Sequence, residues 1–200
     1  MKITAIQTQV RRAGRYSIFV DGKYAFSLSA DALLDAKLTP GQELSSAELT
    51  TYKQLSQTDK AYALTLAYVA RRMRSEGELQ DYFRRKDYDE GFTRSVLVKL
   101  KRLGLVDDAE FARRWVANRR LLKATSTKKL RLELRQKKIS DDIITTVLSE
   151  DEADDQHILR DLIAKKRRIS RYQDDQKLIA YLARQGFGYG DIKAALSDNL

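Results

Sequence analysis

The pattern of apolar and polar positions divides the chain into a short β-rich start and a long helical remainder. Residues 16–20 and 23–28 are apolar and aromatic runs joined by Asp21 and Gly22. A two-residue Asp-Gly connection is typical of a β-hairpin, because a type I′ turn needs a positive φ at both central positions. Residues 3–10 are predicted to add a third strand. Since an isolated hairpin is only marginally stable, we expect this unit to pack against another element.

Helical patterns follow the hairpin. Short helices are predicted near residues 30–36 and 47–56, and Ser45 and Glu48 have the spacing of a capping box at the start of the second one. The most apolar stretch of the chain, residues 61–70, indicates a buried helix. At ten residues it is too short to span a bilayer.

From about residue 59 the apolar pattern has helical spacing and occurs three times. Leu79, Leu130 and Leu178 align at intervals of 51 and 48 residues. Matching positions also hold Leu64, Trp115 and Ile163; Phe83, Leu134 and Leu182; Tyr88, Ile139 and Phe187; and Leu97, Leu148 and Leu196. Such periodicity indicates helical repeats that complete each other's cores.

The predicted fold is therefore mostly α, with three tandem three-helix repeats in an elongated array behind a small N-terminal extension that contains the β-hairpin. We expect the extension to cover residues 1–58. The three-helix repeats are then predicted over residues 59–108, 109–152 and 153–200.

The amino-acid composition argues against several kinds of functional site. The chain has no cysteine, which excludes disulfides and thiolate-ligated metals and suits a reducing cytosol. A single histidine, His157, argues against a histidine-rich metal site and against histidine-based catalysis. The sequence opens without an apolar run of signal-peptide length. We therefore expect a cytoplasmic monomer with no membrane attachment, no metal and no cofactor.

Several short motifs have a structural interpretation. Ser75 and Glu78 fit a capping box, and Gly104 fits a helix end followed by an aspartate cap. The glycines at residues 186–190 lack the strand and the Lys-Ser/Thr of a phosphate loop, so they predict a turn between the last two helices.

Aspartate pairs at residues 107–108, 141–142 and 174–175 stand at predicted helix starts. Paired carboxylates can hold Mg²⁺ in a nuclease, but no Glu or His converges on these pairs in the sequence. Helix capping is the preferred interpretation, and a metal-dependent nuclease is kept as an alternative.

Positive charge is concentrated in one window. The formal net charge is +10, and residues 113–138 hold eleven lysines and arginines against one acid, Glu133. The window has few internal partners of opposite charge, so self-repulsion favours a binding role over a solvated face. A second basic run, residues 165–168, follows an acidic cluster at residues 150–155, and we expect that cluster to neutralise part of it.

Helical geometry places part of this charge away from the core. At 100° per residue the basic side chains of the second helix in the window fall within about 80° of one another, apart from Leu130 and Leu134. These side chains are Lys128, Arg131, Arg135 and Lys138. On the preceding helix, Arg113 and Arg120 are predicted to lie opposite an apolar face of Phe111, Trp115 and Leu122.

Two stretches resemble the RecX family of bacterial regulators of the RecA recombinase. They are residues 72–79 with Lys86, and residues 104–112 with Arg119. The resemblance covers about residues 60–200. The positions that match the family motifs are Arg72, Arg74, Ser75, Glu76, Leu79, Gly104, Asp107, Asp108, Phe111, Ala112 and Arg119.

The resemblance implies a non-enzymatic modulator that lies along the groove of the RecA–single-stranded DNA filament and bridges neighbouring protomers. Such proteins inhibit ATP hydrolysis, strand exchange and filament growth. A stand-alone nucleic-acid-binding helical module is the alternative that the charge alone supports. The predicted contact residues are Arg113, Arg114, Arg119, Arg120, Lys123, Lys128, Arg131, Arg135 and Lys138, with Arg71, Arg72 and Arg74 as a second patch.

Overall fold

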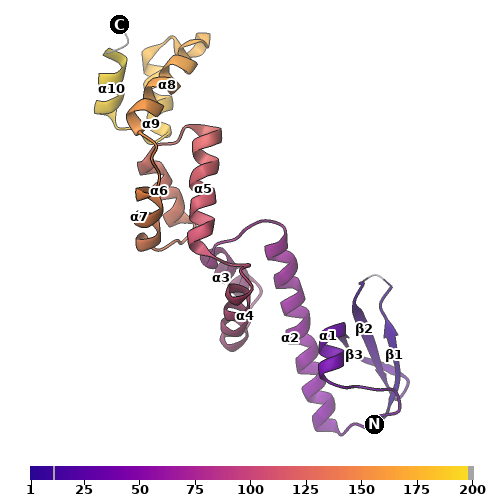
Figure 1. The fold of residues 1–200 in the computed structure, drawn as a ribbon. Coiled ribbons are helices and arrows are strands. Elements are labelled where there is room, and N and C mark those ends of the chain that lie inside the picture. The colour runs from indigo at the N-terminus through magenta and orange to yellow at the C-terminus, as the bar shows by residue number, and fades with distance from the viewer. Residues whose placement is uncertain (11, 198–200) are drawn as a thin grey trace. The chain divides into compact units, whose positions relative to one another are not determined.

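The computed structural model describes residues 1–10 and 12–197, which fall into an N-terminal unit ending at Arg72 and a C-terminal unit beginning at Met73. The ribbon is coloured along the chain in Figure 1. Most described residues are helical, as the sequence pattern predicts. None of the described helices combines the length and the apolar composition needed to cross a membrane.

The N-terminal unit is built on a three-stranded antiparallel sheet in the order β1-β2-β3. The strands are β1 (Ile3–Thr8), β2 (Arg15–Val20) and β3 (Lys23–Ser29). Asp21 and Gly22 join β2 to β3 with φ angles of 48° and 78°, so the predicted two-residue hairpin turn is confirmed. The predicted third strand is also present and pairs with β2.

Two helices complete this unit, α1 (Ala30–Asp35) and α2 (Ser46–Ala70). The predicted capping box of Ser45 and Glu48 is confirmed at the start of α2. The prediction of two separate helices, over residues 47–56 and 61–70, is wrong. They form one continuous helix, because no glycine or proline between Ser45 and Ala70 stops it, and the predicted boundary at residues 58/59 falls inside it.

Within α2, whose residues are all described, the buried side chains are Thr65 and Val69. The expectation of a buried helix over residues 61–70 is therefore wrong for most of that stretch. Leu64, which the repeat pattern aligns with core positions, is exposed. Its apolar side chain lies outside the N-terminal core.

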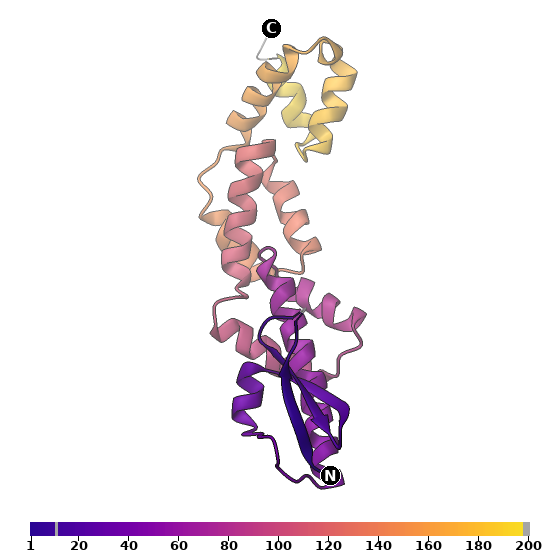
Figure 2. The same cartoon turned by 90° about the vertical axis from the view of Figure 1, so that its right-hand side faces the viewer.

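The sheet packs against α2 through a buried ion pair. Arg15 Nη1 lies 2.9 Å from the carboxylate of Asp59, and both side chains are about nine-tenths buried. Asp59 also accepts hydrogen bonds from the backbone and hydroxyl of Ser29. Phe26 stacks on Tyr52 of α2. Figure 2 shows the strands of this unit side by side, and the expectation that the hairpin packs on another element is confirmed.

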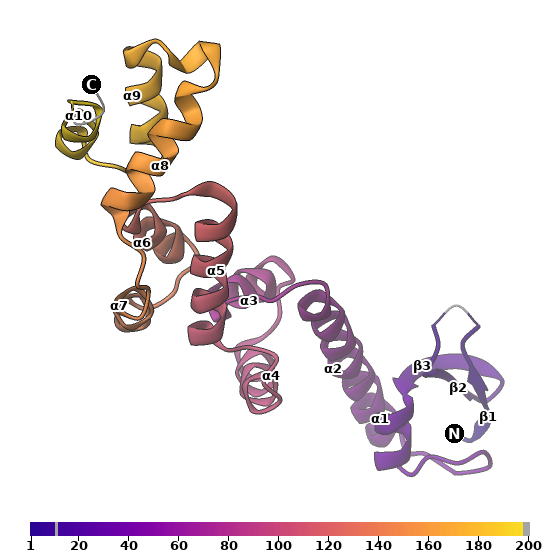
Figure 3. The same ribbon diagram turned by 45° about the horizontal axis from the view of Figure 1, so that its top comes forward.

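The C-terminal unit consists of short helices separated by tight turns. They are α3 (Glu76–Arg85), α4 (Glu90–Arg102), α5 (Asp108–Lys123), α6 (Thr127–Gln136), α7 (Asp141–Ser149), α8 (Asp155–Arg167), the 3₁₀ turn η1 (Ser170–Tyr172), α9 (Asp175–Arg184) and α10 (Tyr189–Ser197). Helices α5–α7 form one packed group and α8–α10 the next, as Figure 3 shows. Residues 198–200 of the predicted third repeat lie outside the described part.

The repeat pattern identified the core of this unit. Leu79, Leu130 and Leu178 are each fully buried. Gly104 ends α4 with a φ of 67°, and Asp107 caps α5 by accepting from the Glu110 amide, both as predicted. Residues 186–188 of the glycine-rich stretch lie in the predicted turn between α9 and α10, and residues 189 and 190 begin α10.

Candidate partner interface

The N-terminus of α3 is held by the next repeat through three polar contacts. The Oγ of Ser75 accepts a hydrogen bond from the Glu78 amide, which confirms the Ser75 half of the predicted capping box, and donates one to the Lys137 carbonyl at 2.7 Å. The Glu76 amide donates to Asp108 at 2.7 Å. The carboxylate of Glu78 accepts from Lys137 Nζ at 2.8 Å. These residues therefore join one repeat to the next.

The same junction is built again one repeat later. Ser126 caps α6 by accepting from the Lys129 amide, and its own amide donates to the Gln185 carbonyl at 3.1 Å. The Thr127 amide donates to Asp155 at 2.8 Å, as the Glu76 amide does to Asp108. Two equivalent contacts at equivalent positions show that the repeats are linked by a common device.

Most carboxylates of the three aspartate pairs make hydrogen bonds or ion pairs within the fold. Asp107 and Asp174 cap helices, and Asp108 accepts from the α3 amide. Asp141 and Asp175 pair with arginines. Over residues 1–10 and 12–197, no three or more metal-ligating side chains form a group that could hold an ion. The helix-capping interpretation is confirmed for Asp107 and Asp174 and is wrong for the pair at residues 141–142, because Ser140 is the N-cap residue of α7.

The basic window is largely neutralised by acids from elsewhere in the fold. The prediction of a self-repulsive window is therefore wrong. It compared each basic residue only with its sequence neighbours, whereas most partners come from other helices. The ion pairs are Arg113 with Glu150, Arg114 with Glu110, Arg119 with Glu133, Arg120 with Asp151 and Asp155, Arg135 with Asp141, Lys137 with Glu78, and Lys138 with Asp81.

Arg120 is a structural residue and not the exposed contact residue that the sequence predicts. Its side chain is 12% exposed and its guanidinium lies 2.8 Å from Asp151 and 3.0 Å from Asp155. It also donates to the Thr125 carbonyl at 2.5 Å. Leu122, predicted on the core face, is 73% exposed. In the last turn of α5 the basic residue is therefore buried and the leucine is exposed, the reverse of the prediction. The reason is that Arg120 meets Asp151, which precedes α8, and Asp155, which begins it.

Arg119 is also held inside the second repeat. Its Nε donates to Glu133 at 2.7 Å, and its guanidinium lies 4.7 Å from the ring centre of Trp115. Glu133 accepts a second bond from the Trp115 indole at 2.9 Å. Lys137 Nζ lies 5.0 Å from the same ring. The single acid of the basic window is thus the centre of a half-buried cluster, and Arg119 belongs to that cluster.

Lys138 lies beyond the end of α6 and so is not on the predicted helical face. Its backbone has a φ of 60°, and its Nζ pairs with Asp81 of α3. A Cβ placed on Gly77 would lie 2.3 Å from the Cβ of Lys138. The glycine therefore leaves room for this lysine in the junction between the first and second repeats.

Three predicted side chains form what we call the α6 basic face: Lys128, Arg131 and Arg135. Lys128 is exposed, and the described residues give it no ion pair. Arg131 reaches Thr145 at 3.4 Å, and Arg135 is paired with Asp141 in an exposed pair. Exposed ion pairs are only weakly stabilising, so Arg135 can exchange its partner for an external anion.

Other predicted contact residues lie outside this face. Arg113, Arg114 and Lys123 are exposed on α5. Arg71 and Arg72 are exposed in the N-terminal unit, whereas Arg74 is half-buried in the C-terminal unit. The second predicted patch is therefore divided between the two units.

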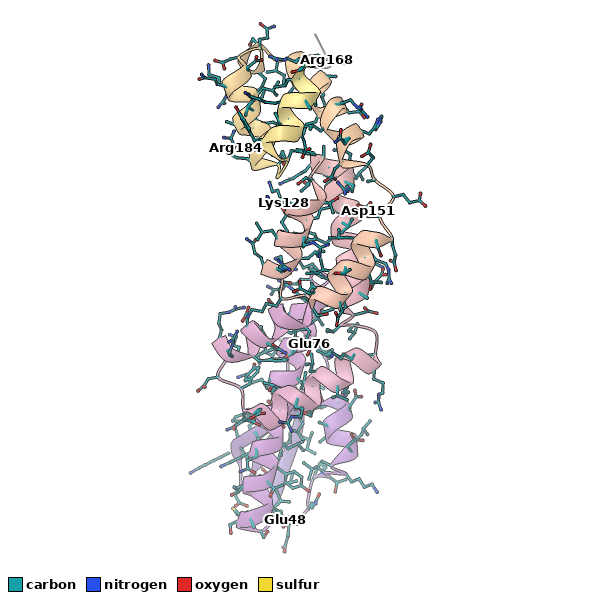
Figure 4. All side chains as sticks on the ribbon, turned by 90° about the vertical axis from the view of Figure 1, so that its left-hand side faces the viewer. Glu48, Glu76, Lys128, Asp151, Arg168 and Arg184 are labelled. Carbon is teal, nitrogen blue, oxygen red and sulfur yellow. The ribbon has the colours of Figure 1, made fainter. Side chains whose placement is uncertain are left out.

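The structure adds one cation that the sequence interpretation missed. Lys129 Nζ donates to the carbonyl of Arg184 at 2.5 Å, which brings the exposed end of α9 to the start of α6. Figure 4 shows Lys128 and Arg184 toward one edge of the C-terminal unit and Asp151 toward the other. The repeat alignment places Arg184 at the end of α9, in register with Gln136 at the end of α6, but it did not predict the contact with Lys129.

Asp108 provides a test of the junction. Burial raises the pKa of this carboxyl, and the hydrogen bond from the Glu76 amide opposes the rise. A raised folded-state pKa means that the folded protein binds the proton more readily, so ionised Asp108 costs stability at neutral pH and the cost disappears as pH falls through that pKa. An Asp108→Asn variant keeps the acceptor without the charge.

We expect Asp108→Asn to melt at or above the wild-type temperature near pH 7, with a difference that shrinks toward about pH 4. Thermal melts followed by circular dichroism measure this. Asp108→Ala, which lacks the acceptor, is the control and should melt lower throughout. A difference between the Asn variant and wild type that grows on acidification would contradict this interpretation.

Comparisons with known proteins agree with the repeat organisation. The family profile for the regulatory protein RecX N-terminal domain matches residues 1–45. Profiles for the first, second and third RecX three-helix domains match residues 61–100, 107–148 and 153–196. The predicted fold class, with three three-helix repeats behind a small extension that contains the hairpin, is thereby confirmed.

Individual relatives cover nearly the whole chain. Regulatory protein RecX of Bacillus subtilis is 31% identical over 97% of this chain and 75% of its own length. The protein of the same name from Bacillus velezensis is 32% identical over 97% and 76%. A crystal structure of regulatory protein RecX, 30% identical, superimposes with a TM-score of 0.72 over 96% of this chain and 98% of that one. RecX from Lactobacillus salivarius, at 23% identity and a TM-score of 0.59, shares the fold over 70% of this chain and 95% of that one.

Proposed function

Since the chain belongs to the RecX family of regulatory proteins, we propose that it binds the RecA–single-stranded DNA filament in the cytoplasm and restrains it. The protein inhibits ATP hydrolysis, strand exchange and filament growth by RecA, and catalyses no reaction of its own. It acts as a monomer that bridges neighbouring protomers. The α6 basic face, two exposed cations and one half-buried cation in the second repeat, is the observation that carries this proposal.

The geometry of the α6 basic face supports contact with an extended anionic partner. Lys128, Arg131 and Arg135 follow one another at spacings of three and four residues, so their side chains project from one side of the helix. Among the described residues, no carboxylate lies within ion-pair distance of Lys128 or Arg131, although the charge of Arg131 contributes to lowering the pKa of Asp141. Lys128 is exposed and Arg131 is half-buried, and neither is held by a close ion pair, so both are available to DNA phosphates or to acidic surface on RecA.

Filament growth tests the proposal directly. RecA assembly on a fluorescent single-stranded DNA is followed with ATP while this protein is titrated in. We expect shorter filaments and slower growth with increasing protein, because a bridging molecule blocks addition of protomers. The inhibition should weaken as salt rises from about 50 to about 200 mM, since charge contacts are screened. Growth that is unchanged at a protein-to-RecA ratio of one would contradict it.

A stand-alone nucleic-acid-binding module is the second candidate, since the same exposed cations suit phosphates without RecA. The aromatic side chains argue against a base-stacking platform. Trp115 is stacked on Phe111 and approached by Arg119 and Lys137. Titration of fluorescent single-stranded DNA with and without RecA separates the two: tight binding without RecA favours the stand-alone module.

A further inference from the structure

A groove of about 310 Å³ lies between the end of α5 and helix α8 in the C-terminal unit. Leu121 and Leu122 line it and are 82% and 73% exposed, although leucine side chains of this size are usually buried. Lys123, Lys165, Lys166 and Tyr181 line it as well. No residue of the α6 basic face is among the lining residues, so the groove is a separate surface.

The groove carries positive charge that the fold leaves available. The described residues supply no carboxylate partner for Lys123 or Lys165, and Lys166 Nζ lies 4.6 Å from the ring centre of Tyr181. Asp161, the acid in the lining, faces His157 at 3.3 Å. Arg120 also lines the groove, but Asp151 and Asp155 neutralise it.

The prediction that the acidic cluster at residues 150–155 neutralises the run at residues 165–168 is wrong. Glu150 and Asp151 pair with Arg113 and Arg120 of α5. Asp154 caps α8, and Asp155 accepts from the start of α6. These carboxylates are engaged inside the second repeat, at the start of α8 and at the junction with the third repeat, and none of them forms an ion pair with a lysine of the groove.

We propose that this groove binds an acidic segment of a partner protein that carries a large apolar side chain. The apolar side chain packs on Leu121 and Leu122, and flanking carboxylates meet Lys123 and Lys165. Such a site combines burial of apolar surface with charge complementarity, the two features that select one protein segment over others. The proposal is independent of the RecA activity.

The composition of the groove favours a protein segment over the other occupants. Nucleic acid uses phosphate contacts and base stacking, and two leucines provide neither. The Tyr181 ring is already covered by Lys166 and lies 5.2 Å from the Tyr172 ring. A second copy of this chain, docked groove to groove in a two-fold contact, would bring Lys123 and Lys165 against like charges.

Nuclear magnetic resonance of the ¹⁵N-labelled full chain tests the proposal. The probe is the peptide Glu-Asp-Glu-Leu-Leu-Glu-Asp-Glu, compared with the same peptide in which serines replace both leucines. We expect saturable shifts at the amides of residues 121–124 and 165–166 with the leucine peptide. The serine peptide should bind about tenfold more weakly, because it buries no leucine.

Matched variants locate the effect. The double variant Leu121→Ser/Leu122→Ser and the variant Lys165→Glu should each weaken binding about tenfold. Their controls are Leu132→Ser, another exposed leucine, and Arg160→Glu, an exposed cation on α8 outside the lining. These controls should bind as wild type does, and the amide spectrum shows that each variant is folded.

Four outcomes would overturn the proposal. Three concern the probes: no saturable shift with the leucine peptide, equal binding of the two peptides, or stronger shifts of the same amides by a single-stranded thymidine oligonucleotide. The fourth is a spectrum whose groove amides broaden with protein concentration alone, which would assign the surface to self-association. RecA is absent from every arm, so failure here is distinct from failure of the proposed regulatory activity.

Discussion

Replacing Arg120 by alanine is expected to lower the free energy of unfolding by about 3 kcal/mol, because it leaves two carboxylates without their cation in a mostly buried site. Arg120 is bonded to Asp151, Asp155, the Thr125 carbonyl and the Thr127 hydroxyl. It thus joins the end of α5 to the starts of α6 and α8. Its loss removes the polar centre of the junction between the second and third repeats.

Urea unfolding measures this effect. Circular dichroism follows the helices, and the fluorescence of Trp115, the single tryptophan of the chain, reports on the second repeat. The matched control is Arg113→Ala, which removes an ion pair of similar length whose two side chains are each 48% exposed. We expect that change to cost much less than the loss of Arg120, because water screens an exposed ion pair. Equal urea midpoints for the two variants would show that Arg120 stabilises the protein no more than an exposed ion-paired arginine does.

Replacing Gly77 by alanine is expected to destabilise the protein by about 2 kcal/mol, as overpacked interiors do. A glycine-to-alanine change within a helix normally stabilises a protein by about 1 kcal/mol, so a loss of stability here would be the opposite of the usual effect. The added Cβ would lie 2.3 Å from Lys138 Cβ and 2.9 Å from its Cδ. The first repeat must then move away from the turn between α6 and α7.

A second substitution tests the cause. Lys138 has a φ of 60°, which glycine adopts without strain, so Lys138→Gly removes the opposing Cβ and fits the turn. In the double variant Gly77→Ala/Lys138→Gly, the alanine should cost less than 0.5 kcal/mol relative to Lys138→Gly alone, about the level of independent sites. Thermal melts of the four proteins measure the coupling. Additive effects would contradict a direct contact between the two residues.

Local patterns predicted the elements of this fold well, because caps and turns depend on neighbouring residues. Ser45, Asp107 and Gly104 mark helix ends as expected, and Asp21 and Gly22 form the hairpin turn. The 25-residue length of α2 was not predicted. The sequence patterns at residues 47–56 and 61–70 predict two helices, although no glycine or proline separates them.

The candidate site was only partly predictable, because the partner of a charged side chain is set by tertiary contacts. Arg113 meets Glu150 and Lys138 meets Asp81, over separations that no helical periodicity describes. The repeat alignment held part of the answer. It places Lys138 in register with Gly186. In the first junction the glycine, Gly77, is at the helix start and faces Lys138 in the turn. In the second junction the glycine, Gly186, is in the turn and faces the helix start at Lys129.

The α6 basic face is the central claim, and RecA ATPase on single-stranded DNA tests it most directly. The test variant reverses all three charges, Lys128→Glu, Arg131→Glu and Arg135→Glu. Its matched control reverses three exposed lysines of the N-terminal unit, Lys23→Glu, Lys53→Glu and Lys60→Glu, which changes the net charge equally. Circular dichroism confirms that both variants keep their helices.

We expect the wild-type chain and the control variant to inhibit ATP hydrolysis alike. The α6 variant should need at least about tenfold more protein for half-inhibition, the effect of losing three contacts worth about 0.5 kcal/mol each. Inhibition by the α6 variant at wild-type concentrations would contradict the assignment of this face.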